Sequence, residues 1–140
     1  MRTKPLTYKE FDAVMRKHKI PFHYSQVVEG AGKMNEYTIE GKIVACFSEC
    51  VDAPTATEIW NAGLKRAFDS YSESGKQNKP LYYSGDNMKM IVFPRPEEGY
   101  AEHTVVFNNI ALTILCHDDY LEETKQILSE LSLLMPLKSA

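Results

Sequence analysis

The 140-residue chain predicts a single α+β domain, in which an antiparallel sheet built from hairpins has helices packed on one face. Segments with helical periodicity lie near the start, in the middle and at the end of the chain, and strand-like segments fill the stretches between them. The connections between those strands are short, which favours hairpins over the longer crossovers that a parallel sheet needs. The length suits one domain, residues 1–140, better than two.

The first helix is expected to begin after Thr7. Thr7 and Glu10 form the pattern of a capping box, Phe11 and Met15 lie on one apolar face, and Pro21 ends the helix near residue 19.

Three strands are expected next, over residues 22–28, 36–39 and 42–49. The continuous apolar run at 43–47 is typical of a strand that is covered on both faces, and it predicts a central place in the sheet.

The middle helix has two start signals, Asp52 and the pair formed by Thr55 and Glu58. It carries the strongest helical stripe of the chain, and the residues of that stripe are Trp60, Leu64, Ala67, Phe68 and Tyr71.

Two more hairpins follow. Strands at 81–83 and 87–93 flank residues 84–86, and strands at 104–107 and 110–116 flank two asparagines, which tolerate the positive φ of a tight turn.

The final helix is expected to begin at Asp118 or Asp119, and its apolar stripe extends to Leu134, with Pro136 as the stop. The predicted order of elements is therefore α-β-β-β-α-β-β-β-β-α.

The composition is that of an ordinary globular protein. Apolar residues make up 44% and charged residues 25% of the chain, so it can bury a core without a metal or a disulfide. The net charge of -3 excludes a uniformly basic surface of the kind that holds nucleic acid. Residues 1–20 are nevertheless basic and residues 97–140 acidic, an asymmetry of the kind that steers a charged partner.

No complete catalytic, cofactor or metal motif occurs in the sequence. The three cysteines are an odd number, which favours free thiols over a disulfide framework. Cys46 and Cys50 are four residues apart, whereas a zinc knuckle has two residues between its cysteines. The sequence therefore predicts a non-enzymatic protein with no catalytic residues, no cofactor and no metal.

A cysteine–histidine pair remains open, because sequence spacing does not show which side chains meet in space. The candidates are Cys50 or Cys116 with His23, His103 or His117.

A recognition patch is predicted over residues 76–100. Tyrosine supplies a large contact area at low entropic cost, and basic side chains accompany the tyrosines in this segment. The candidate binding residues are Tyr82, Tyr83, Met88, Lys89, Arg95 and Tyr100. The alternative is an ordinary half-exposed hairpin.

Several short motifs resemble a group of small α+β domains of unknown function from Firmicute bacteria, many of them lipoproteins. The motifs are the E-F-x-x-x-M pattern that starts at Glu10, the Ala67-Phe68 pair of the middle helix and the turn at Asn108. The resemblance implies the fold and no activity, so it carries no site residues over. The chain lacks the lipid-anchoring leader of that group.

We therefore expect a protein–protein interaction module, for example a small intracellular inhibitor or immunity-type protein of a bacterium. The start of the chain lacks the apolar segment of a signal peptide, and no apolar run is long enough to span a bilayer. These observations predict a cytoplasmic location, with a protein partner and without nucleic acid or membrane.

Three alternatives stay open. One is a small-ligand-binding domain, with an apolar cavity lined by Trp60, Phe68 and Met90. Another is a structural domain that forms a homodimer through a strand edge or a helix face. The third is an enzyme that uses a cysteine or a histidine on the sheet.

Overall fold

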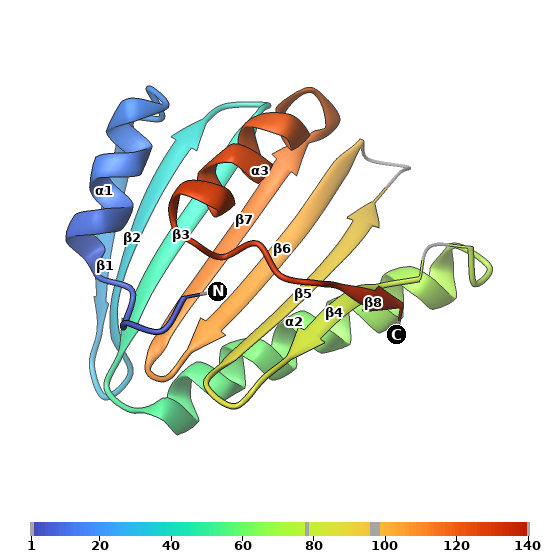
Figure 1. The fold of residues 1–140 in the computed structure, drawn as a ribbon, viewed down its shortest axis with the longest axis horizontal. Coiled ribbons are helices and arrows are strands. Elements are labelled where there is room, and N and C mark those ends of the chain that lie inside the picture. Colours follow the sequence, from blue (N-terminus) through green and yellow to red (C-terminus); the bar gives the residue numbers. More distant parts are fainter. Residues whose placement is uncertain (1, 78, 96–98, 140) are drawn as a thin grey trace.

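The computed structural model describes residues 2–77, 79–95 and 99–139, and it contains one antiparallel eight-stranded sheet with three α-helices (Figure 1). The strands lie in the order β1-β2-β3-β7-β6-β5-β4-β8. The predicted class, α+β with a sheet built from hairpins, is confirmed. No helix in the described parts of the chain is long and apolar enough to cross a membrane.

The bounds of the elements follow the prediction closely in the first half of the chain and less closely in the second. The helices are α1 (Tyr8–Lys17), α2 (Ala53–Glu73) and α3 (Leu121–Glu130), the last preceded by a 3-10 turn (Asp118–Tyr120). The strands are β1 (Phe22–Val28), β2 (Gly32–Ile39), β3 (Ile43–Cys50), β4 (Leu81–Ser84), β5 (Met88–Arg95), β6 (Tyr100–Phe107), β7 (Ile110–His117) and β8 (Lys138–Ser139).

The helices cover both faces of the sheet, which corrects the expectation that they lie on one. In Figure 1, α1 and α3 lie in front of the sheet and α2 lies behind it. The physical reason is the chemistry of the central strands. Seven of the eight residues of β6 are buried, so this strand has apolar or shielded side chains on both faces, and both faces need a cover.

The larger core lies between the sheet and the pair α1 and α3. Phe11 and Met15 of α1 and Ile127 and Leu128 of α3 are almost completely buried against the sheet. The rings of Phe11 and Phe47 have their centroids 5.2 Å apart. Each such side chain contributes roughly 1.5–3 kcal/mol by leaving water, so these contacts anchor both helices.

The opposite face packs against α2 through a stripe that contains small residues. Ala56, Trp60, Gly63 and Ala67 are buried there, and a Cβ atom at Gly63 would lie 3.2 Å from Oγ1 of Thr104. Glycine at this position therefore lets the helix approach β6 closely.

The sequence-predicted stripe of α2 included Phe68, which is 49% exposed. That assignment is wrong, because the stripe that faces the sheet is narrower than the apolar pattern of the helix. Arg66, two positions before Phe68, does contact the sheet: its guanidinium lies 3.0 Å from the buried carboxylate of Glu102 on β6.

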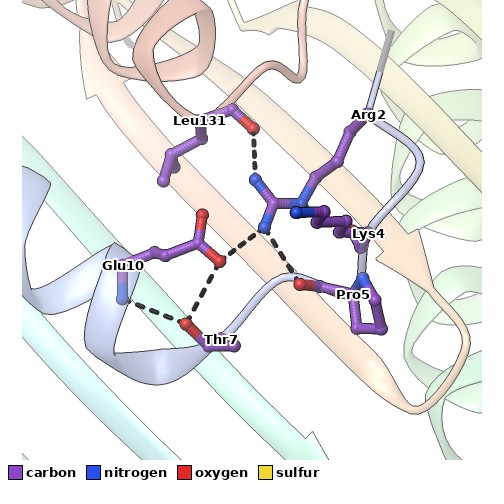
Figure 2. Close-up of polar contacts among 6 residues, drawn as sticks. All are labelled: Arg2, Lys4, Pro5, Thr7, Glu10 and Leu131. Carbon is purple, nitrogen blue, oxygen red and sulfur yellow. Dashed lines mark hydrogen bonds and ion pairs between the residues drawn. The ribbon is translucent and has the colours of Figure 1, made fainter.

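The starts of α1 and α2 agree with the predicted caps, whereas α3 begins at Leu121, after the 3-10 turn and without a side-chain cap, and not at Asp118 or Asp119. The side chain of Thr7 accepts a hydrogen bond from the backbone amide of Glu10, and the side chain of Asp52 accepts one from the backbone amide of Thr55. Figure 2 shows a contact that the sequence did not indicate. The guanidinium of Arg2 reaches the carboxylate of Glu10 at 2.6 Å and the carbonyl of Leu131 at 3.0 Å, so it joins the start of α1 to the end of α3.

The end of α3 differs from the prediction, which extended the helix to Leu134. The helix stops at Glu130 because Ser132 adopts a left-handed φ of 56°. The amide of Leu133 then donates to the carbonyl of Leu128 at 2.7 Å, which closes the helix end. The chain continues across the sheet to β8 (Figure 1).

Candidate functional site

The two edges of the sheet differ in length and in chemistry. At one end of the sheet, β8 is two residues long, begins with Lys138 and covers the outer side of β4. At the other end, β1 is seven residues long and exposed throughout, and it contains no Lys, Arg, Asp or Glu. Proteins protect sheet edges with short strands and lysines. The β8 edge has that protection, and β1 lacks it.

The side chains of β1 add an apolar surface to this open edge. Phe22, Tyr24, Val27 and Val28 are all exposed, and Val27 reaches 74%. The register between β1 and β2 shifts between Phe22 and Tyr24, which marks a β-bulge. Unpaired backbone groups beside exposed apolar side chains are what an added strand uses to bind.

The opposite face of the sheet is only partly covered beside β1. α2 packs mainly against β5, β6 and β7, and less closely against β3. The side chains of Met34 and Glu36 on β2 and of Val44 and Cys46 on β3 point to this face and are half-buried. We call these four residues, with Tyr24 of β1, the open face.

A groove of about 330 Å³ lies where the end of β1, the start of β2 and the end of β3 meet the first half of α2. Its wall is mostly apolar and includes Val28, Ala31, Met34, Cys50 and Ile59.

Gly32 shapes the floor of this groove. It has a φ of 141°, and a Cβ atom there would lie 2.1 Å from the carbonyl oxygen of Glu49. Glycine therefore allows β2 to begin directly against the end of β3.

The carboxylate of Glu36 is the polar centre of the open face. It lies 2.6 Å from Nδ1 of His23 and 3.1 Å from the hydroxyl of Thr38, and it accepts from Sγ of Cys46 at 3.7 Å. Burial, together with the charge of Glu36, raises the pKa of Cys46 to about 12. Cys46 is therefore a thiol at neutral pH, and the carboxylate separates it from the imidazole of His23, so the arrangement does not activate a sulfur nucleophile.

The six residues of the predicted recognition patch do not form one surface. Tyr82 and Lys89 are exposed, Tyr100 is half-buried against His117, and all three belong to the α2 face. Met88 is buried in the core on the α1 and α3 side, and Tyr83 packs against that same core. The sixth residue, Arg95, ends β5, where its backbone pairs with Tyr100 of β6.

The residues named for a ligand cavity lie apart as well. Trp60 of α2 is buried in the core between this helix and the sheet, Phe68 is exposed, and Met90 belongs to the core on the other face of the sheet. Among the residues that the structure describes, no group of three or more His, Cys, Asp or Glu side chains is arranged to hold a metal ion.

The sequence located β1 as a strand but did not single it out as a site. A usable signal was present, because residues 22–28 lack charge although the segments around them are rich in Lys and Glu. Local sequence patterns do not reveal the strand order, and β1 is an edge strand only because of that order.

Comparison with family models and with curated proteins found no match. The fold is similar to that of a solved Thermotoga maritima protein described as a GTP binding regulator, with a TM-score of 0.51 and 11% sequence identity. The alignment covers 89% of this chain and 84% of that one. At this identity the likeness shows the fold alone.

Proposed function

We propose that the chain is a non-enzymatic protein-interaction module that takes up an extended segment of a protein partner as an added strand beside β1. The observation that supports this most strongly is the contrast between the two sheet edges, one protected by β8 and one open, with exposed apolar side chains and without Lys, Arg, Asp or Glu. Strand addition gives affinity through main-chain hydrogen bonds and specificity through alternate side chains.

The chemistry of β1 defines the segment that would bind. It is extended, free of proline and rich in β-branched or aromatic residues, because it must continue the ladder and contact Phe22, Tyr24 and Val27. An inhibitor of another protein fits this description, because its β1 edge would bind an extended segment that the target needs for its own function. The three free cysteines support a reducing, cytoplasmic location for this module.

A peptide selection tests the proposal. Random peptides displayed on phage are selected on the immobilised full chain, and the binders are measured against the wild type and Val27→Lys. A lysine on the edge should weaken binding at least about tenfold, because it places a hydrated charge beside the added strand. Leu134→Lys is the matched control, since Leu134 is 52% exposed and lies in the segment between α3 and β8.

Amide hydrogen exchange gives the position of binding. A bound peptide should slow the exchange of the β1 amides and leave the β8 amides unchanged. Peptides that bind Val27→Lys as tightly as the wild type, or that leave β1 exchange unaltered, would rule the proposal out.

A further inference from the structure

We infer that the strand taken up by β1 is β1 of a second copy of this chain, paired antiparallel about Gln26, with Tyr24 of each copy entering the groove of the other. This inference rests on the proposed strand addition at β1 and names its partner.

The direction of the β1 side chains is the first step. Tyr24 is paired with Glu36 and Gln26 with Met34, and Val28 lines the groove, so these three point to the α2 face of the sheet. Ser25 and Val27 alternate with them and point to the opposite face. The strand thus has two different sides, and an added strand must match both.

Pairing about Gln26 matches both sides at once. It places Tyr24 opposite Val28 of the second copy on the α2 face, and Ser25 opposite Val27 on the other face. The two-fold symmetry repeats each pair, and a cross-strand pair of an aromatic and a β-branched residue stabilises a sheet by roughly 0.2–1 kcal/mol. The absence of Lys, Arg, Asp and Glu from β1 means that self-pairing brings no such like charges together.

The groove is the second, independent part of the argument. Val28 forms part of its wall, and side chains directly opposite each other on paired strands have Cβ atoms about 5 Å apart. A tyrosine opposite Val28 therefore stands at the mouth of a groove whose volume of about 330 Å³ can admit a phenol ring. Ser48, Thr55 and Glu58 line the same groove and offer oxygen acceptors to the phenol hydroxyl.

Tyr24 is available for this role. Its side chain is 39% exposed and rests edge-on against the ring of His23. Within the described ranges, no hydrogen bond engages its hydroxyl group. In the paired state the ring would leave water and the hydroxyl would gain an acceptor, so each copy would complete the groove of the other.

Analytical ultracentrifugation of the full chain over a range of concentrations tests the inference. The wild type should form a dimer, and both Val27→Lys and Tyr24→Ser should raise its dissociation constant at least about tenfold. Tyr82→Ser is the matched control, because Tyr82 is 38% exposed and lies on β4 near the other edge. It should leave the dissociation constant unchanged.

Disulfide trapping tests the register. Gln26→Cys should form a cross-linked dimer on oxidation, since the pairing brings position 26 of both copies face to face. Ser25→Cys should not, because it faces position 27. A dimer that Val27→Lys or Tyr24→Ser leaves intact, or that Ser25→Cys traps instead, overturns the inference.

A chain that stays monomeric also overturns the inference. The proposed function still stands in that case if selected peptides bind at β1, and it falls as well if they do not.

Discussion

Nδ1 of His18 lies 2.7 Å from a carboxylate oxygen of Glu123, so one hydrogen bond joins α1 to α3. The other ring nitrogen lies 3.0 Å from Glu130, which also pairs with Lys17. The His18 side chain is only 7% exposed. Burial lowers the pKa of His18, but the hydrogen bonds to both glutamates outweigh burial and raise it above the ordinary value of 6.5.

We expect His18→Gln to change how stability depends on pH. The pKa of His18 is higher in the folded protein than in the unfolded chain. The hydrogen bonds of His18 to Glu123 and Glu130 therefore stabilise the protein fully below about pH 6.5, and this stabilisation is lost as the pH rises through the folded pKa. The free energy of unfolding of the wild type should therefore decline on the alkaline side, and that of the variant should stay flat there. At about pH 6 the variant should be less stable by about 2 kcal/mol. Urea unfolding at several pH values measures both effects, and parallel profiles would contradict the expectation.

His103 should have the opposite sign. It is 4% exposed on β6, and burial lowers its pKa to about 4. The unfolded chain binds a proton below about pH 6.5, whereas the folded chain does so only near pH 4, so stability should fall between these values by about 2–3 kcal/mol. His103→Leu should remove that acid-side decline. The comparison uses the slope against pH, so a change in packing that shifts all values equally does not affect it. An unchanged slope would show that His103 is not the group responsible.

Arg2 should contribute to stability although it lies near the start of the chain. Its side chain is 9% exposed and its guanidinium donates to Glu10, Pro5 and Leu131 (Figure 2). Arg2→Ala should lower the free energy of unfolding by about 2 kcal/mol, because charged hydrogen bonds are lost and the carbonyl of Leu131 loses its donor. Lys4→Ala, at an exposed neighbour, should stay within about 0.5 kcal/mol. Equal effects of the two substitutions in urea unfolding would refute a specific role.

Gly32 and Gly41 separate two reasons why a backbone position requires glycine. Both have positive φ, 141° and 73°, but a Cβ atom at Gly41 meets nothing within 4 Å. Gly41→Ala should therefore cost about 1–2 kcal/mol for the left-handed conformation alone. Gly32→Ala adds a clash with the backbone of Glu49 and should cost several kcal/mol, or prevent folding. Thermal unfolding compares them, and similar losses would show that the clash is relieved cheaply.

Local chemistry in the sequence was enough to predict most elements. Thr7 and Asp52 cap their helices as expected, and the turn at Asn108 uses a φ of 53° that asparagine tolerates. The predicted end of α3 was wrong because the apolar stripe continues past Ser132, whereas the helical backbone conformation stops before it. Periodicity reports which side chains are apolar, and it does not report the conformation of a single residue that turns the chain.

The candidate site was harder to predict than the fold. The tyrosine-rich segment was selected for its side chains, yet the pleat sends Tyr82 and Tyr83 to opposite faces of β4. The open edge depends on which strands are neighbours, and this is decided by the pairing of β3 with β7 across about sixty residues of chain. No local pattern contains that pairing. The lack of charge in β1 becomes informative only once the strand is known to be terminal.

The pairing of β3 with β7 also constrains synthesis of the chain. While residues 43–50 leave the ribosome, their central partner, residues 110–117, has not yet been made. The first three strands therefore emerge as a meander whose inner side has no completed cover, because α3 follows β7 in the chain. Completion of the central sheet must wait for a late, long-range contact, so a nascent chain stalled before residue 110 should depend on holding chaperones.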